Sequence, residues 1–391
     1  MSVVSELGTT RPALAVAAEL GAAADARWGE LDTGCRVPAD LYESALRAGL
    51  FRSLVPAAMG GSGWDPVEWF RIGVELARHD VSFGWVVTQG AAELGWIAAG
   101  GDPEWAATVL GDPLAASAST IAGFGNLAVD GDDAVVSGTW AFNSGAHGAT
   151  WIGGLCLVAG TSGPDGLPAL RFAWVPSDRA RIIEDWDPIG MRGTGSNSTE
   201  IAEQSIPAAW TFSPFQTTEN DRGAHRCVVG NGNWPIAGSV AACQLGAARR
   251  AIDEAVQLVT TKAPAPDFVP LAHNAAVQRT LIRAEGIWAG CIASVERELE
   301  SMWDEAHRTG ELSSEQRVRL FTANAAANEH AVAIINDMCA ITGTAAMHRA
   351  HPLSRCRRDS QSLQGHISTN GSAIEKAAKI RLGLLDADRL V

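Results

Sequence analysis

The chain has 391 residues, of which 47% are hydrophobic and 19% are charged, and its formal net charge is −14 at pH 7. This acidic balance, without a long basic stretch, excludes nucleic acid and anionic membrane surfaces as expected partners. A mean hydropathy of +0.04 excludes a disordered or fibrous chain, and the length favours two or three lobes over a single core.

The first third of the chain is patterned for helices. From residue 12 to about 110 the apolar residues recur with a helical period, and amphipathic segments are predicted near residues 38–50 and 67–78. The segment 81–99 is almost wholly apolar, which is typical of a buried helix.

The pattern changes to short β-type runs after residue 115. Strands are predicted at residues 134–142, 151–158 and 170–176, with turns rich in Gly, Asp and Pro between them. These runs indicate a compact β domain that ends near Pro207.

Helical periodicity returns after Trp234. Apolar residues three and four apart predict a bundle of four helices, at about residues 240–259, 277–302, 318–341 and 360–384. The predicted class is α+β, with an N-terminal helical domain, a central β-barrel-like domain and a C-terminal four-helix bundle, at residues 1–114, 115–212 and 213–391.

The cysteines and the first residues of the sequence indicate the cellular compartment. Seven cysteines are scattered without a CxxC pair or metal-ligand spacing, and the first residues lack a basic-then-apolar leader. We therefore expect reduced thiols, no metal site and a cytoplasmic protein. The longest charge-free stretch, residues 137–164, is broken by Gly, Asn, Ser and His, so no membrane helix is expected.

Three motifs fit this order of domains. They are AGLF–LVP–GG within residues 48–61, ELARHDVSFGW at 75–85 and GMRGTGSN at 190–197, the last followed by Ile206-Pro207. Together with the order of helices, strands and bundle, they resemble the acyl-CoA dehydrogenase superfamily over nearly the whole chain. The resemblance implies that superfamily's fold.

A fourth motif is similar to one branch of that superfamily. Residues 138–145, GTWAFNSG, resemble the Trp-x-Phe-x-Ser-Gly signature of two-component flavin-dependent monooxygenases of group D. The resemblance places Ser144 near flavin N5, where it would support a C4a-hydroperoxyflavin. A strand with this ending can present backbone amides and a hydroxyl to the flavin, with Gly145 leaving room for the ring. The residues implied to contact flavin are Trp140, Phe142, Asn143, Ser144, Gly145, Ser196 and Asn370.

His366 lies seven residues past the Arg358-Asp359 pair, where acyl-CoA dehydrogenases carry a tyrosine followed by their catalytic glutamate. An imidazole that titrates near neutrality suits the removal of a proton from a phenol or an indole nitrogen. By resemblance His366 faces the flavin across the substrate cavity as the catalytic base. A purely structural histidine is the alternative, and His147 is expected to have only a loop role.

No carboxylate is predicted at the positions where dehydrogenases keep their base. Between Gln204 and Asp253 the only acidic residues are Glu219 and Asp221, and Glu375 lies more than two helical turns beyond His366. This absence favours an oxygenase over a dehydrogenase.

Cofactor specificity is left open by the sequence. The Arg-x-x-Phe-Gly element that holds the adenine half of FAD in dehydrogenases is replaced by residues 261–268, so either FAD or FMN would fit. No GxGxxG fingerprint follows a strand, so reduced flavin is expected from a separate NAD(P)H-dependent reductase.

The aromatic residues indicate the class of substrate. The chain has fourteen tryptophans against one tyrosine. By resemblance, Trp85 and Trp96 lie on a helix that borders the substrate, which favours a flat aromatic or polycyclic molecule, although core packing is the alternative for most tryptophans.

The sequence thus predicts a monooxygenase, expected as a homotetramer, that uses reduced FAD or FMN and O2 to hydroxylate an aromatic small molecule. A thioester-oxidising dehydrogenase, an N- or S-oxygenase of the same fold, and a catalytically silent binding protein are the alternatives.

Overall fold

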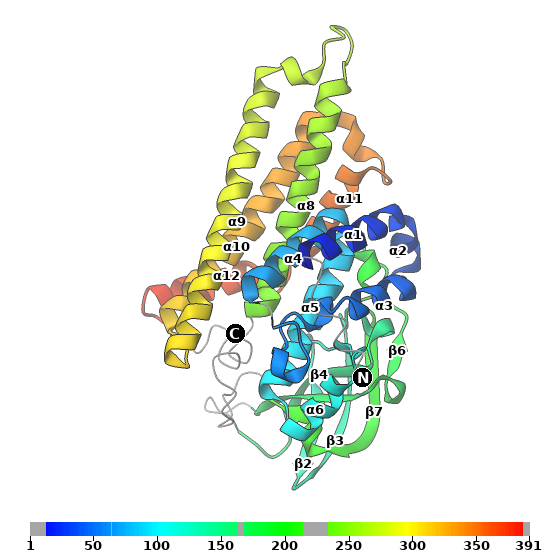
Figure 1. Cartoon of the computed structure of the whole chain (residues 1–391), viewed down its shortest axis with the longest axis vertical. Coiled ribbons are helices and arrows are strands. Elements are labelled where there is room, and N and C mark those ends of the chain that lie inside the picture. The colour runs from blue at the N-terminus through cyan, green and yellow to red at the C-terminus, as the bar shows by residue number, and fades with distance from the viewer. Residues whose placement is uncertain (1–12, 64, 163–167, 214–233, 386–391) are drawn as a thin grey trace.

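The computed structural model describes residues 13–63, 65–162, 168–213 and 234–385. Figure 1 shows helices from the first part of the chain beside a curled sheet, and a bundle of long helices that extends away from the sheet. The order of helices, sheet and bundle confirms the predicted fold class. The acidic residues Glu219 and Asp221 lie outside the described residues.

The N-terminal part is helical, as predicted. Its segment near residues 38–50 ends earlier than expected, because the α-helix stops at Arg47 and a short 3₁₀ turn follows at Leu50–Arg52. The α-helices of this part are α1 (Ala13–Ala26), α2 (Trp28–Gly34), α3 (Ala39–Arg47), α4 (Pro66–His79), α5 (Val81–Gly100) and α6 (Pro103–Gly111).

Helix α5 is the central element of the molecule. Asp80 starts it by accepting a hydrogen bond from the backbone N–H of Phe83 at 2.9 Å. Its residues 81–99 are all buried, as the apolar pattern predicts, and α4, α8 and the end of α11 pack against it. The same helix contributes side chains to the cavity described below.

The central sheet has the strand order β6-β7-β3-β2-β4-β5-β8, and β1 pairs with β4. Strands β3, β4 and β5 match the predicted runs. The long strand β7 was not predicted, because residues 198–207 contain few apolar side chains and these do not alternate regularly with polar ones. The strands are β1 (Ser117–Ala118), β2 (Gly125–Asp130), β3 (Asp133–Trp140), β4 (Trp151–Val158), β5 (Leu170–Pro176), β6 (Arg181–Ile183), β7 (Ser198–Pro207) and β8 (Thr211–Phe212).

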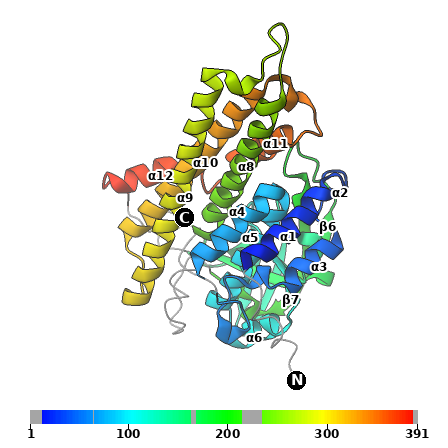
Figure 2. The same ribbon diagram turned by 45° about the horizontal axis from the view of Figure 1, so that its top comes forward.

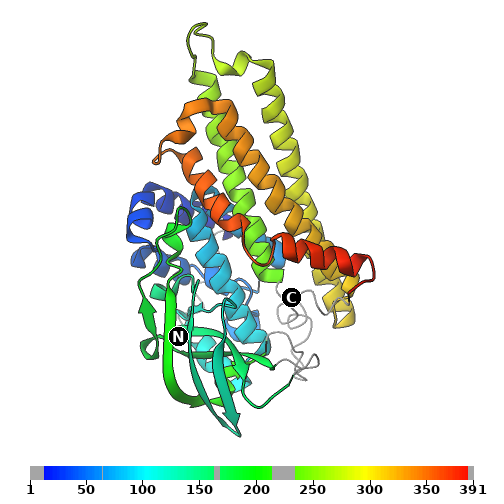
Figure 3. The ribbon, with the colours of Figure 1, turned by 180° about the vertical axis from the view of Figure 1, so that it is seen from behind.

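The C-terminal bundle contains α8 (Trp234–Thr261), α9 (Ala275–Thr309), α10 (Ser314–Thr342) and α11 (Pro352–Gln364). Figures 2 and 3 show these helices side by side, with α12 (Gly371–Arg381) crossing at one end. The predicted fourth segment, 360–384, is therefore wrong as a single helix. It is broken at residues 365–370, and its first half begins at Pro352.

The described residues contain no helix that is long and apolar enough to cross a membrane. The same part of the chain has no group of three or more His, Cys, Asp or Glu side chains arranged to hold a metal ion.

Candidate active site

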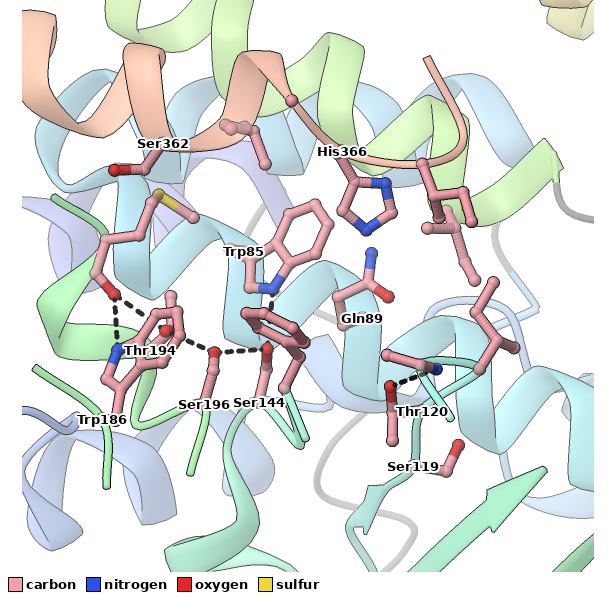
Figure 4. A pocket seen from close by; sticks show the side chains of 18 of the residues that line it. Trp85, Gln89, Ser119, Thr120, Ser144, Trp186, Thr194, Ser196, Ser362 and His366 are labelled. Carbon is pink, nitrogen blue, oxygen red and sulfur yellow. Dashed lines mark hydrogen bonds between the residues drawn. The ribbon is translucent and has the colours of Figure 1, made fainter. Parts of the chain in front are cut away.

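A cavity of about 410 Å³ lies where α5, the loops of the sheet and the end of α11 meet (Figure 4). Its volume is within the range of small-molecule sites. Glu93 and His366 are the only ionisable side chains among the described lining residues. The lining consists of Trp85, Gln89, Glu93, Ser119, Thr120, Ile121, Ala122, Phe142, Ser144, Trp186, Met191, Thr194, Ser196, Ile236, Ser362, Leu363, Gly365, His366 and Ile367.

His366 lies in the turn between α11 and α12 and lines the cavity, as the sequence predicts. Its Nδ1 is 2.7 Å from the Ser368 hydroxyl, and the Ser368 backbone N–H also donates to Nδ1 at 3.3 Å. The other ring nitrogen, Nε2, points towards Gln89 in Figure 4. The turn therefore fixes one edge of the imidazole and leaves the opposite edge to the cavity.

The protonation state of His366 differs from the expectation of an imidazole that titrates near neutrality. Burial lowers the pKa of this side chain to about 4. The ring is therefore neutral at physiological pH. Because Nδ1 accepts from the Ser368 backbone N–H, the proton of the neutral ring lies on Nε2, which faces the cavity. The ring is a weaker base than an exposed histidine.

Trp85 connects the two sides of the cavity. Its indole Nε1 donates to Ser144 Oγ at 3.0 Å, and its ring meets His366 edge to face with 5.2 Å between ring centroids. Trp85 thus lines the cavity, as predicted.

A chain of hydroxyls runs from Ser144 into the protein (Figure 4). Ser144 Oγ is 2.7 Å from Ser196 Oγ, which is 2.6 Å from Thr194 Oγ1, and Thr194 donates to the carbonyl oxygen of Met191 at 2.8 Å. A carbonyl oxygen only accepts, so the hydroxyl proton of Thr194 must point to Met191. This choice fixes the direction of the other hydrogen bonds in the row, since each hydroxyl has one proton. Ser196 then donates to Thr194, Ser144 donates to Ser196, and Trp85 donates to Ser144.

This direction leaves Ser144 as an acceptor towards the cavity. Its only proton is used within the chain of hydroxyls, while its oxygen keeps one lone pair. Reduced flavins carry an N–H at N5 and oxidised flavins do not, so the hydroxyl fits a reduced ring.

The backbone beside Ser144 corrects one expectation. The N–H groups of residues 143–146 each donate to a backbone carbonyl oxygen of the protein, so none is free to reach a ligand. Gly145 has φ +75°, and an added Cβ would lie 3.1 Å from Val86 Cγ1, on the helix side. The glycine therefore serves the turn and its packing.

Phe142 supplies an exposed apolar surface next to the hydroxyls. The residue has φ 63°, is 60% exposed and meets Trp186 edge to face at 5.9 Å. An exposed ring beside a polar edge fits a flat heterocycle, so Phe142, Ser144 and Ser196 are the residues suited to hold a flavin.

The structure places four other predicted site residues away from the cavity lining. Trp140 is fully buried and donates to the Leu155 carbonyl oxygen at 2.8 Å, and Trp96 packs against Phe172. The Asn143 amide donates to Thr199 Oγ1 at 2.7 Å, and Asn370 caps α12.

Their common role is to support the elements that carry the site. His147, expected in a loop role, lies next to Glu184 with 2.8 Å between its Nε2 and the carboxylate.

Two lining residues were missed by the sequence interpretation. Gln89 and Glu93 lie one and two helical turns beyond Trp85 on α5, so all three face the cavity. They are polar residues at four-residue spacing in an otherwise apolar helix, and that spacing is the signal that could have found them.

Glu93 adds a carboxyl group to the cavity from α5, a position other than those where dehydrogenases are expected to keep their base. Burial raises its pKa to about 8, against the lowering effect of polar groups of Ser117 and Ser119. The side chain is therefore mainly protonated at pH 7 and does not present the carboxylate base of a dehydrogenase.

Comparisons with known proteins identify the family of the chain. Residues 13–116 match the acyl-CoA dehydrogenase N-terminal domain, and residues 239–371 match the acyl-CoA dehydrogenase C-terminal domain. This chain belongs to the acyl-CoA dehydrogenase family.

Within the family, the chain is similar to proteins named as monooxygenases. It is 25% identical over 366 residues to an indole-3-acetate monooxygenase of Acinetobacter baumannii, covering 92% of this chain and 91% of that protein. It is 26% identical over 357 residues to the oxygenase component of an FADH2-dependent resorcinol hydroxylase of Rhizobium sp., covering 87% and 86%.

Among solved structures, XiaF from Streptomyces sp., in complex with FADH2 and glycerol, superposes with a TM-score of 0.86 at 18% identity. The match covers 98% of this chain and 96% of XiaF. At that identity the likeness supports the fold alone.

Proposed function

We propose that this protein is the oxygenase component of a two-component flavin-dependent monooxygenase that hydroxylates an aromatic small molecule. It takes reduced FAD or FMN from a separate NAD(P)H-dependent flavin reductase and uses O2 as co-substrate. The observation that carries the proposal is a cavity in which Trp85 links a neutral imidazole, His366, to the hydroxyl of Ser144. Relatives named as monooxygenases of indole-3-acetate and resorcinol support the reaction class.

The side chains of the cavity have different roles in the proposed reaction. A bound reduced flavin supplies the activated oxygen. Phe142 offers its exposed face to the ring, and Ser144 accepts a hydrogen bond from a ring N–H. The buried surface around Trp85 and Met191 keeps water from the reacting atoms, which favours oxygen transfer over release of hydrogen peroxide.

His366 acts on the substrate rather than on the flavin. Full transfer of a proton from a free phenol to an imidazole of pKa about 4 is uphill by about 6 pKa units, or on the order of 8 kcal/mol. While Nδ1 accepts from Ser368, the neutral ring carries its proton on Nε2, which donates to a substrate oxygen. Nε2 accepts the substrate proton only in the other tautomer, in which Nδ1–H donates to the Ser368 hydroxyl at 2.7 Å, and it does so as the aromatic carbon is attacked and the substrate group becomes more acidic.

Replacing His366 tests this assignment. His366→Ala should lower the rate of hydroxylation by on the order of 10²-fold or more, since a positioned proton acceptor is lost, while the affinity for reduced flavin stays within twofold. Stopped-flow mixing of the anaerobic protein–flavin complex with oxygenated buffer and substrate, with product and hydrogen peroxide quantified, measures both. His348→Ala removes an exposed histidine and is the matched control.

Hydroxylation by His366→Ala at the rate of the unaltered protein would remove the proposed role. Hydrogen peroxide as the only product of the unaltered protein, with every aromatic compound tried, would count against the monooxygenase itself.

A thioester-oxidising dehydrogenase is the second candidate, because Glu93 provides a carboxyl group at the cavity. Its raised pKa weighs against a base at neutral pH. A dehydrogenase would bleach bound oxidised FAD when an acyl thioester is added without oxygen, whereas the proposed monooxygenase would not.

We also infer a homotetramer and a cytoplasmic location. Exposed apolar side chains on the bundle, among them Phe268 and Ile282, support self-association. The six described cysteines are free thiols, which agrees with a reducing compartment.

A further inference from the structure

One end of the cavity is polar, with Gln89 beside His366 (Figure 4) and Glu93 beside Ser119. Trp85, Gln89 and Glu93 recur every fourth residue along α5, so their side chains form a row on one helix face. Gln89 and Glu93 are 8% and 4% exposed, and both line the cavity. The loop that follows β1 brings Ser119 to the same end.

Three buried polar atoms at this end make no hydrogen bond of ordinary geometry among the described residues, although Ser119 lies close enough to the Glu93 carboxyl to lower its pKa. They are Gln89 Nε2, Glu93 Oε2 and Ser119 Oγ. Buried polar groups in native proteins are nearly always paired, and a cluster of unpaired groups in a cavity indicates a polar ligand atom. The three groups together offer an amide donor, a carboxyl and a hydroxyl.

The charge of this end of the cavity limits which chemical groups it can bind. The described lining contains no lysine or arginine. A carboxylate placed beside the neutral Glu93 would lose its hydration in a buried site without a cation to offset its charge, which disfavours binding. A primary amide instead pairs with a carboxylic acid through two hydrogen bonds, since each group has one donor and one acceptor facing the other.

We propose that Gln89, Glu93 and Ser119 form a specificity site that binds an uncharged substituent with both a donor and an acceptor, of the primary-amide class, on the aromatic substrate and rejects a carboxylate. The inference rests on the proposed function and extends it to the substrate class. It sets this chain apart from the indole-3-acetate monooxygenases to which it is similar, whose named compound carries a carboxylate.

The test compares two ligands that differ in this group alone. Isothermal titration calorimetry of the full-length protein at pH 7, without flavin, measures the affinities for phenylacetamide and phenylacetate. We expect the amide to bind at least tenfold more tightly. Glu93→Leu should bring the two affinities within about twofold of each other, whereas Glu93→Gln, which keeps a neutral hydrogen-bonding group, should retain the preference for the amide.

A second variant tests the proposal independently, in case substitution of Glu93 impairs folding. Gln89→Leu removes the neighbouring donor and should weaken amide binding about tenfold while leaving phenylacetate unchanged. Glu104→Leu, on the exposed face of α6, should behave as the unaltered protein in both titrations.

Equal or tighter binding of phenylacetate, no binding of phenylacetamide, or an undiminished preference for the amide in Glu93→Leu would overturn the inference. Because the titrations use neither flavin nor oxygen, their failure leaves the monooxygenase assignment standing. Conversely, a protein that releases only hydrogen peroxide can still show the ligand preference.

Discussion

Glu93 is a single residue whose protonation state matters for both the cavity and the fold. Its carboxyl is buried in α5, and its pKa is raised to about 8 from an ordinary value of 4.5. The folded protein therefore keeps this proton between about pH 4.5 and pH 8, where the unfolded chain has lost it. The stability that the neutral form contributes is fully present below pH 4.5 and is lost as the pH rises towards 8.

A neutral replacement should remove this pH dependence. Relative to the unaltered protein, Glu93→Gln should gain on the order of 4 kcal/mol in unfolding free energy between pH 4.5 and pH 8, because the amide never ionises. Urea unfolding followed by tryptophan fluorescence at pH 5 and pH 9 measures the difference. Glu104→Gln, an exposed control, should follow the unaltered protein, and a Glu93→Gln difference that stays constant with pH would contradict the raised pKa.

The hydroxyl chain supports a second prediction at the residue scale. Thr194→Val keeps the shape of the side chain but removes the acceptor for the Ser196 proton, so Ser196 can turn and Ser144 can donate towards the cavity. We expect the preference for reduced over oxidised flavin to fall several-fold.

Anaerobic titrations of reduced and oxidised flavin measure that ratio directly. Ser362→Ala serves as the control. It removes a hydroxyl that lines the cavity but does not belong to the hydrogen-bonded hydroxyls of Ser144, Ser196 and Thr194, so the ratio should stay unchanged. An unaltered ratio in Thr194→Val would show that Ser144 does not act through Thr194.

At the scale of elements, the loop of residues 190–195 docks on α11 and positions the site. Met191 N–H donates to Asp359 Oδ1 at 2.7 Å, and a Cβ added at Gly190 would lie 2.3 Å from the carbonyl oxygen of Arg358. Burial raises the pKa of Asp359 to about 7, and the neighbouring Asp80 acts in the same direction. Asp359 is thus an internal anchor and forms no ion pair with Arg358.

The close backbone approach makes Gly190 a test of this docking. Gly190→Ala forces the loop away from α11 and should cost about 1–3 kcal/mol of unfolding free energy, with weaker binding of aromatic ligands because Met191 shifts. Gly286→Ala, in an exposed part of α9 with open space around the added methyl, should instead stabilise by about 0.5–1 kcal/mol. Denaturant unfolding and ligand titration of both variants measure these effects.

A Gly190→Ala protein as stable as the unaltered one, with the same ligand affinity, would show that the loop tolerates displacement from α11 and that this contact does not position the site.

The same elements show how far the sequence predicts the structure. Strong periodicity identified α4, α5 and the long bundle helices, because their buried faces are apolar. Helix α11 was misplaced because its buried face is polar, with Arg355, Asp359 and Ser360 inside and paired through contacts distant in sequence. Ser144, His366 and Trp85 were correctly expected at one cavity, but Trp96 faces the core.

The remainder of the site depends on tertiary contacts that no local pattern reports. Two of the backbone N–H groups after Phe142 donate to carbonyl oxygens distant in sequence, Asn143 to Asn197 and Gly145 to Thr194. The sequence does not show that these N–H groups are already paired, so it wrongly suggested that they would contact a flavin. The same holds for the low pKa of His366, which arises from burial.

For the whole molecule, the bundle extends beyond the sheet (Figure 3). It carries exposed apolar side chains. Phe268, between α8 and α9, is 72% exposed, and Ile282 on α9 is 75% exposed. Apolar side chains in such positions are typical of subunit contacts.

We expect a species of four 41.0 kDa chains by size-exclusion chromatography with light scattering. The pair Phe268→Asp and Ile282→Asp should shift it to smaller species, because charges at an apolar contact cost binding energy. Val135→Asp, on the sheet, is the control. A monomer in the unaltered protein would contradict the tetramer.

The break between α11 and α12 has a practical consequence for redesign. His366 is carried by residues 365–370, a short connection whose neighbours are fixed by the two flanking helices. Altering the length or composition of that connection would swing the imidazole to a new place while the bundle keeps its packing. Libraries confined to the exposed positions Gly365 and Ile367 would diversify reactivity towards new aromatic compounds with little risk to folding, whereas Ser368 and Thr369 are buried and Asn370 caps α12.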